Sequence, residues 1–135
     1  MNYFHAIIKP LNGLFELFEG LKKYSCFVAI ATTDCIERAR LAMRHIGVEG
    51  SIDFIAGADS VKKSKPATFI ADLITNKLGI SKESSAMVGD VVSDVQIGAN
   101  AKFGASIGVA SGLTTAKKLL EITPFVALSI ADIYI

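Results

Sequence analysis

The sequence lacks the features that would indicate a membrane, a secretory route or a nucleic acid. No apolar run approaches the roughly 18 to 20 residues of a membrane span, and the longest runs only from Cys26 to Ala31. The start, Met1 to His5, does not show the basic and then apolar pattern of a secretory signal. Lys and Arg number 14 against 13 Asp and Glu, which leaves no broad electrostatic footprint for nucleic acid or an anionic membrane. We therefore expect a cytoplasmic protein with neither kind of partner.

Disulfides and the common nucleotide loops are also missing. Cys26 and Cys35 lie at opposite ends of a predicted strand, too far apart to bond, so both should be reduced. Neither Gly-x-x-x-x-Gly-Lys nor Gly-x-Gly-x-x-Gly occurs. His5 and His45 stand alone, without the spacing of metal ligands. A disulfide framework, a P-loop and a dinucleotide fingerprint are therefore excluded.

What the sequence does have is a wound α/β pattern. Apolar residues make up 51% of the chain, which fits a parallel sheet covered by helices on both faces. Asp34 and Glu37 form a capping-box pattern, and Pro66 suits the first turn of a later helix. Short β-branched runs, predicted as strands, alternate with amphipathic stretches, predicted as helices. The strands are 26–31, 52–56, 85–88, 105–109 and 125–128, and the helices are 14–24, 35–46, 65–78, 93–103 and 114–121.

Polar residues follow several of these strands. Thr32 and Thr33 follow the first strand, Asp90 follows the third with Asp94 four residues later, and Lys65 follows the weak second strand. Ligands of a wound sheet bind beyond the carboxyl ends of its strands. Hydroxyls, an ammonium and two carboxylates at one edge suit a phosphate and a magnesium ion. Singly, each residue is better explained as a helix cap, a surface lysine or a strand end, so the prediction rests on their order and placement.

The chemical reasons differ from residue to residue. Carboxylates at positions i and i+4 can face one way from a turn into a helix, and Gly89 lets the backbone turn sharply before Asp90. A lysine neutralises charge on phosphoryl oxygens, while a threonine hydroxyl and free amides at a helix start bind one of those oxygens.

Three runs make a family resemblance specific. Residues 29–33 (Ala-Ile-Ala-Thr-Thr), 65–67 (Lys-Pro-Ala) and 87–94 (Met-Val-Gly-Asp-Val-Val-Ser-Asp) resemble the second, third and fourth motifs of the haloacid dehalogenase superfamily. Residues 9–13 (Lys-Pro-Leu-Asn-Gly) are similar to the junction where its phosphoglycolate phosphatases and β-phosphoglucomutases return from the cap domain to the core. The match covers nearly the whole chain.

This resemblance implies a fold, a reaction and a set of roles. The fold would be a three-layer, Rossmann-like α/β core with a mainly parallel sheet, in which 1–12 are a remnant of the cap junction and 13–135 the core domain. The reaction would be magnesium-dependent hydrolysis of a phosphate monoester, a small phosphorylated metabolite, through an aspartyl-phosphate. Thr32 and Thr33 would bind the phosphoryl group, Lys65 would steady it, Asp90 would ligate Mg²⁺ and Asp94 would support the metal. Thr32 and Lys65 would thus be the catalytic residues present.

The first motif of the family is missing. Its nucleophile is the first Asp of an Asp-x-Asp pair, and aspartate occurs here only at 34, 53, 59, 72, 90, 94 and 132. In a rival alignment 5–14 echo the first motif, but Pro10 then replaces the nucleophile and Asn12 the general acid. Either way the attacking carboxylate is absent, so we expect the isolated chain to be inactive, with Asp34 as the nearest substitute.

Three interpretations remain open: a fragment of a phosphatase, a half-enzyme completed by a separate chain, or a non-catalytic domain that binds phosphate or a protein. In the family, the first-motif strand lies between the strands that precede Thr32 and Asp90. Its loss, like that of the cap, would leave the core incomplete, with unpaired backbone mid-sheet. We expect residues 3–8 to fill that gap, the flanking strands to close up, or a second chain, in a homo-oligomer or a complementing pair, to cover it.

Overall fold

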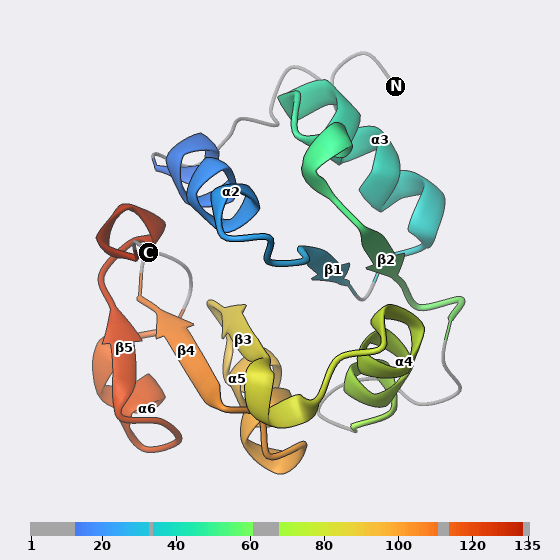
Figure 1. Cartoon of the computed structure of the whole chain (residues 1–135). Helices are drawn as coiled ribbons and strands as arrows, with labels where there is room; N and C mark the ends of the chain where they lie inside the picture. The colour runs from blue at the N-terminus through green and yellow to red at the C-terminus, as the bar shows by residue number, and fades with distance from the viewer. Residues whose placement is uncertain (1–12, 33, 61–67, 111–113, 134–135) are drawn as a thin grey trace.

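The structure is a computed structural model that describes residues 13–32, 34–60, 68–110 and 114–133 (Figure 1). Its helices and strands alternate as predicted, and most are a few residues shorter than their patterns suggested. The strands are β1 Ala29–Ala31, β2 Phe54–Ala56, β3 Ala86–Gly89, β4 Ala105–Val109 and β5 Phe125–Ala127. The α-helices are α2 Leu14–Lys23, α3 Ile36–Ile46, α4 Phe69–Leu78, α5 Val92–Asn100 and α6 Ala116–Leu120. Three short 3-10 turns are η1 Glu49–Ser51, η2 Lys82–Ser84 and η3 Ile130–Asp132.

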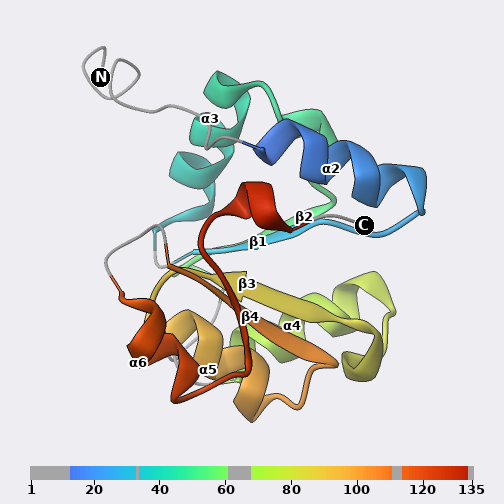
Figure 2. The ribbon, with the colours of Figure 1, turned by 90° about the vertical axis from the view of Figure 1, so that its left-hand side faces the viewer.

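The parallel sheet is divided into two parts. β1 pairs with β2, while β3, β4 and β5 form a separate sheet in that order, and every pair is parallel. Within the described ranges no strand pairing joins β1 to β3, although the two lie next to each other in both views (Figures 1 and 2). The expectation that the flanking strands close up is therefore wrong. Residues 3–8 lie outside the described part of the chain, and a covering second chain stays a prediction.

Helices cover the sheet in two layers. Figure 2 shows α2 and α3 on one side and α4, α5 and α6 on the other. β2 contacts both α3 and α4, whereas α5 and α6 pack on β3, β4 and β5. We call the place between β1 and β3, where the described strands are not paired, the break. One core cluster spans the break, because side chains from both sheets, from α4 and from α5 pack together in it. Its buried members are Ala56, Ile70, Ala71, Ile97 and Ala101.

The contact between α5 and the second sheet depends on a glycine. A Cβ atom at Gly98 would lie 2.5 Å from Ser106 Oγ and 2.7 Å from Met87 Cβ, closer than real Cβ contacts allow. The Ser106 hydroxyl donates to the carbonyl of Val95 in α5, and the Thr123 hydroxyl donates to the carbonyl of Ser106. These buried hydroxyls are thus satisfied, as buried polar groups must be, and they tie β4 to α5 and to the segment that leads into β5.

The helix ends partly agree with the sequence prediction. α3 ends at Gly47 and α4 at Gly79, both with the positive φ expected of a C-terminal glycine. The predicted capping box is wrong, because Cys35 is the N-cap of α3 without a side-chain cap bond. The Glu37 side chain accepts instead from Arg40. α4 begins at Phe69, and the helix start predicted at 65–66 falls outside the described residues.

Candidate functional site

Thr32 follows β1 directly, as predicted. Its amide donates to the carbonyl of Ala56 at 3.0 Å, so the pairing with β2 continues to this residue. Its hydroxyl oxygen accepts from the amide of Asp34 at 3.1 Å. Because a hydroxyl that accepts one bond still carries a proton, Thr32 can donate that proton to a phosphate oxygen. Thr33 and Lys65 lie outside the described residues.

Asp90 and Asp94 stand at the end of β3. Gly89 is the last residue of β3, the exposed Asp90 follows it, and Asp94 lies in the first turn of α5, where it is half-buried. A Cβ atom on Gly89 would collide with the Asp94 side chain. The Asp94 side chain therefore packs over the Gly89 backbone, and glycine at this position is what permits the approach.

The ends of β1 and β3 lie on the same side of the molecule. Figure 2 shows β1, β3 and β4 running in a common direction and ending at one edge. Thr32 and Asp90 thus follow the two strands that border the break in the sheet. The structure brings the predicted hydroxyl and carboxylates to this carboxyl edge.

The start of α3 differs from the prediction. We expected free amides at a helix start to bind a phosphoryl oxygen, yet the amides of Cys35 and Ile36 donate to Asp34 Oδ1 at 2.9 Å and to Asp59 Oδ1 at 3.1 Å. The other oxygen of Asp34 lies 3.3 Å from Arg38 Nε. Asp34 therefore serves the helix start, which argues against it as a substitute nucleophile.

Asp59 is the residue that sequence reasoning missed here. Asp59 lies in the loop after β2, far from α3 along the chain, so no local sequence pattern predicts that it accepts a hydrogen bond at the start of α3. A Cβ atom on Gly57 would lie 2.7 Å from the Asp34 carbonyl oxygen and 2.9 Å from the Ile36 amide nitrogen. That close approach of the β2 loop to the start of α3 is what places Asp59 there.

The carboxylates can be tested against a magnesium ion. Within 13–32, 34–60, 68–110 and 114–133, no three His, Cys, Asp or Glu side chains gather so that they could hold a metal ion. Asp90 and Asp94 nevertheless offer two carboxylates at one strand end. Mg²⁺ prefers one or two carboxylates together with waters and a substrate phosphate. The pair therefore fits a magnesium ion that keeps several water ligands, and does not fit an ion enclosed by protein alone.

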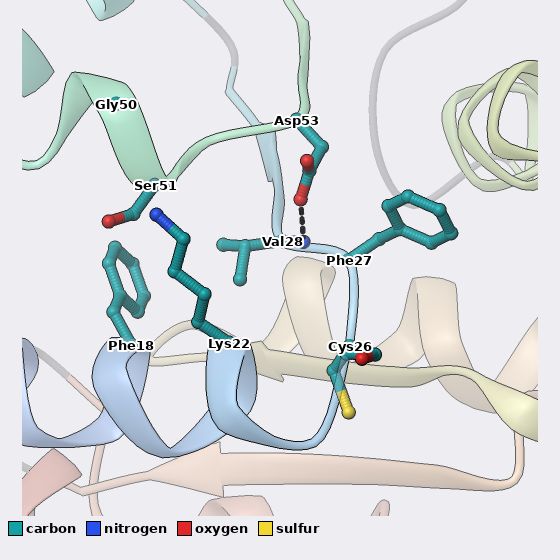
Figure 3. A pocket seen from close by; sticks show the side chains of 9 residues that line it. Phe18, Lys22, Cys26, Phe27, Val28, Gly50, Ser51 and Asp53 are labelled. Carbon is teal, nitrogen blue, oxygen red and sulfur yellow. Dashed lines mark hydrogen bonds between the residues drawn. The ribbon is translucent and has the colours of Figure 1, made fainter.

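A pocket of about 290 Å³ lies elsewhere, between α2, the chain before β1 and the chain before β2 (Figure 3). The Asp53 carboxylate accepts from the amide of Val28 at 2.7 Å, and this bond ties the two chain segments together. None of the predicted site residues lines the pocket. It opens beside the starts of β1 and β2, away from the carboxyl edge. The lining residues are Phe18, Lys22, Ser25, Cys26, Phe27, Val28, Gly50, Ser51 and Asp53.

Cys26 and Cys35 are both free thiols, as expected. None of the helices described has the length and apolarity that crossing a membrane requires.

Comparisons with known proteins agree with the resemblance seen in the motifs. The family model for haloacid dehalogenase-like hydrolases matches residues 1–107. The chain is 32% identical over 95 residues to the pyrophosphatase PpaX of Halalkalibacterium halodurans, covering 70% of this chain and 44% of that protein. It is 28% identical over 118 residues to a phosphorylated carbohydrates phosphatase of Thermotoga maritima, covering 87% of this chain and 55% of that protein.

A solved structure gives the same fold. The crystal structure of a candidate β-phosphoglucomutase from Thermotoga maritima superposes with a TM-score of 0.89 at 25% identity, covering 97% of this chain and 61% of that chain. The chain thus spans about half the length of the curated relatives it matches. The match to the solved structure likewise leaves part of that protein without a counterpart here.

Proposed function

Because this chain belongs to the haloacid dehalogenase-like hydrolases, we propose that its carboxyl edge is the phosphate and magnesium site of a phosphatase for small phosphorylated metabolites. The two curated relatives reported above are a pyrophosphatase and a phosphatase by name, which supports the reaction class. The observation that carries the proposal is the packing of Asp94 over Gly89 beside Asp90, at the end of a strand that borders the break. The cytoplasmic location expected from the sequence belongs to this proposal.

The roles follow from the chemistry of each side chain. Asp90 and Asp94 hold Mg²⁺ through carboxylate oxygens, and the ion, when bound, supplies charge neutralisation for the phosphate. Thr32 donates its hydroxyl proton to a phosphoryl oxygen. The proton is available for this because the hydroxyl only accepts in its bond with the Asp34 amide. Thr33 and Lys65 complete the phosphate contacts in this proposal, with Lys65 as a point charge on the phosphoryl oxygens.

The chain on its own binds phosphate and Mg²⁺ but does not hydrolyse a phosphate monoester. Covalent phosphatase chemistry needs a carboxylate nucleophile, and no Asp-x-Asp pair occurs in the sequence. Loss of a nucleophile costs orders of magnitude in rate, while the groups that bind charge keep part of their affinity. Asp34 offers no replacement, because its oxygens contact the Cys35 amide and Arg38.

Two measurements on the purified chain test this proposal. We expect no hydrolysis of p-nitrophenyl phosphate or phosphoglycolate above the Asp90→Asn background at millimolar Mg²⁺. Calorimetric titration should detect weak Mg²⁺ binding that Asp90→Asn abolishes. Glu121→Gln is the matched control, because Glu121 is an exposed carboxylate before β5, away from the carboxyl edge. Hydrolysis by the chain alone that Asp90→Asn removes would contradict the inactivity, and unchanged Mg²⁺ binding in Asp90→Asn would contradict the metal site.

A specific observation favours a second candidate, the half-enzyme. Among the residues that the structure describes, no strand pairing joins β1 to β3, and the family resemblance places the strand of the missing first motif between these two strands. A separate chain bearing that strand would supply the nucleophile. The non-catalytic binding domain has no comparable observation in its favour.

A further inference from the structure

The β2 loop, residues 57–60, is fastened to the start of α3. The amide of Ala58 donates to the carbonyl of Asp34 at 2.8 Å, and the Asp59 carboxylate accepts from the amide of Ile36 at 3.1 Å. Figure 1 shows the chain that leaves β2 beside the start of α3. The loop donates one of these hydrogen bonds and accepts the other, so it grips the start of α3 at two points.

The β2 loop is itself a closed turn. The amide of Ser60 donates to the carbonyl of Gly57 at 3.0 Å, and the Ser60 hydroxyl oxygen accepts from the amide of Gly57 at 3.0 Å. Gly57 is buried, and a Cβ atom there would collide with the Asp34 carbonyl oxygen and the Ile36 amide nitrogen. A turn that is closed by its own bonds and packed this closely has little room to shift. Asp59 therefore reaches the Ile36 amide from a fixed base.

The start of α3 also holds the hydroxyl of Thr32. The amide of Asp34 donates to Thr32 Oγ1 at 3.1 Å, while the carbonyl of Asp34 accepts from the β2 loop. A threonine side chain has only a few staggered rotamers, and its hydroxyl proton points where its accepted bonds leave room. The position of the Asp34 amide therefore selects the rotamer of Thr32 and the direction in which its proton is offered.

Asp59 differs from Asp34, the other carboxylate at this place. The Asp34 carboxylate contacts the Cys35 amide and lies 3.3 Å from Arg38 Nε, both within its own stretch of chain. Asp59 brings its hydrogen bond to the helix start from another element, the β2 loop. Such an exposed bond adds little to stability, because water competes for both partners, but it fixes the direction of the Ile36 amide. Without it the start of α3, and the Asp34 amide with it, can turn relative to the β2 loop.

We infer that Asp59 is a positioning residue for phosphate binding: by holding the Ile36 amide, it sets the Asp34 amide and thereby the Thr32 hydroxyl that donates to a phosphoryl oxygen. The inference rests on the proposed function, which supplies the phosphate that Thr32 meets. Asp59 acts through Thr32 and needs no contact of its own with the phosphate. A purely electrostatic role would have the opposite sign, because a carboxylate near an anion repels it and its removal would strengthen phosphate binding.

The first measurement is a titration of the full chain with inorganic phosphate at millimolar Mg²⁺, followed by the NMR shifts of backbone amides. We expect Asp59→Ala to weaken phosphate binding about three- to tenfold, the effect of one hydrogen bond. Asp59→Asn should stay within about twofold of the unchanged chain, because its side-chain carbonyl can accept from the Ile36 amide. Ser81→Ala is the matched control, since Ser81 Oγ also accepts from a backbone amide, that of Ser84, but does so before β3 and away from the carboxyl edge. It should leave phosphate binding unchanged.

Two further measurements separate positioning from a general loss of stability. Thr32→Val removes the hydroxyl, so Asp59→Ala should weaken phosphate binding in the unchanged chain and have little further effect in Thr32→Val. NMR couplings across the Cα–Cβ bond of Thr32 report its rotamer without any ligand. We expect one rotamer in the unchanged chain, in Asp59→Asn and in Ser81→Ala, and an average of several in Asp59→Ala. Circular dichroism and urea unfolding check that every variant is folded under the conditions used.

Each other outcome has a definite consequence. Stronger phosphate binding in both Asp59 variants overturns the inference, because Asp59 then acts as a charge. Equal losses from Asp59→Ala with and without the Thr32 hydroxyl, or an equal loss in Ser81→Ala, also overturn it. If the unchanged chain binds no phosphate near Thr32, the proposed function fails and the couplings alone decide the inference. Averaging in Asp59→Ala then still supports the control of Thr32 by Asp59, whereas a single unchanged rotamer overturns it.

Discussion

The part of the sheet built on β3, β4 and β5 and the part built on β1 and β2 are stabilised by different kinds of interaction. In the part built on β3, β4 and β5, the largest fully buried side chains are gathered: Val95, Ile97 and Leu119. In the part built on β1 and β2, α2 buries none of its side chains. The buried apolar residues of this part, including those of α4, which packs on β2, are Ala39, Val48, Ile55, Ala56, Ile70 and Ala71. The side-chain hydrogen bond of Asp59 and the ion pairs of Arg38 and Arg44 in this part lie at the surface.

This difference has an energetic consequence. Burial of apolar area stabilises in proportion to the area removed from water, so close packing of large side chains contributes the most. Surface hydrogen bonds and ion pairs contribute much less, because water competes for both partners. We therefore expect the β3–β5 part to resist unfolding through its core, and the β1–β2 part to open first. Four substitutions test this contrast, from the largest expected effect to the smallest.

Ile97→Ala should have the largest effect. Ile97 lies in α5 with no exposed surface and belongs to the cluster that crosses the break. Truncation of a buried isoleucine removes transfer energy and leaves a cavity, at a cost of about 2 to 5 kcal/mol. Urea unfolding should show a lower midpoint with an unchanged slope. Leu120→Ala in the neighbouring helix α6 is the control, because Leu120 is 56% exposed. An effect of Ile97→Ala no larger than that of Leu120→Ala would contradict the conclusion that the β3–β5 part is stabilised by its apolar core.

Gly98→Ala should have the next largest effect. The added methyl group would meet Ser106 and Met87 at less than van der Waals distance, and such overpacking costs about 1 to 3 kcal/mol. Gly50→Ala is the control in the other part of the molecule, because a Cβ atom there has no neighbour within 4 Å. Thermal unfolding of both variants measures the difference. Equal melting temperatures would show that α5 can move away from the sheet without penalty.

The order of elements was predictable from the sequence because it depends on local patterns. Gly47 and Gly79 end α3 and α4 as predicted, since a left-handed residue after a helix has a clear signature. β4, the middle strand of its sheet, has the predicted limits, whereas β1 is much shorter than the apolar run that suggested it. An apolar run in the sequence shows which residues are apolar, but the length of the strand depends on how many of them form hydrogen bonds with the neighbouring strand.

The site was predictable in part for the same reason. Thr32 and Asp90 directly follow β1 and β3 as predicted, and Asp94 lies in the first turn of the helix after β3, because the carboxyl ends of parallel strands meet at one edge. The start of α3 could not be predicted, because Asp59 reaches it from a loop far along the chain. Contacts between distant residues leave no periodic trace in one sequence.

Asp59→Ala should have a smaller effect than either core substitution. The Asp59 carboxylate accepts from the Ile36 amide at the start of α3, and removal of such a cap costs about 0.5 to 2 kcal/mol. Glu19→Ala, an exposed change in α2, should cost much less. Urea unfolding compares the two. A loss as large as that of Ile97→Ala would mean that the β1–β2 part depends on its polar contacts as heavily as the other part depends on its core.

The smallest effect should come from the ion pair between Arg44 and Glu49, and it should depend on pH. Arg44 Nε and Nη2 donate to the two carboxylate oxygens of Glu49, both at 3.1 Å, and thereby tie the end of α3 to η1. This hydrogen bonding to Arg44 lowers the pKa of the Glu49 carboxyl, and its bond to Glu49 raises the pKa of the Arg44 guanidinium. The Arg44 side chain is 63% exposed, so solvent screens the pair.

A carboxyl whose pKa is lower in the folded state stabilises the fold above its ordinary pKa, and this contribution is lost as the pH falls through the lowered value. Arg44 stays charged throughout that range, so Glu49 alone sets the window. The melting temperature of Glu49→Gln should therefore lie slightly below that of the unchanged chain at pH 7, and the two should converge in strong acid. They should also converge at 1 M salt, where the screening length is about 3 Å. Glu121→Gln, which removes an exposed carboxylate elsewhere, corrects for the change in net charge. A gap that persists undiminished in acid would show that Glu49 acts through packing rather than through its charge.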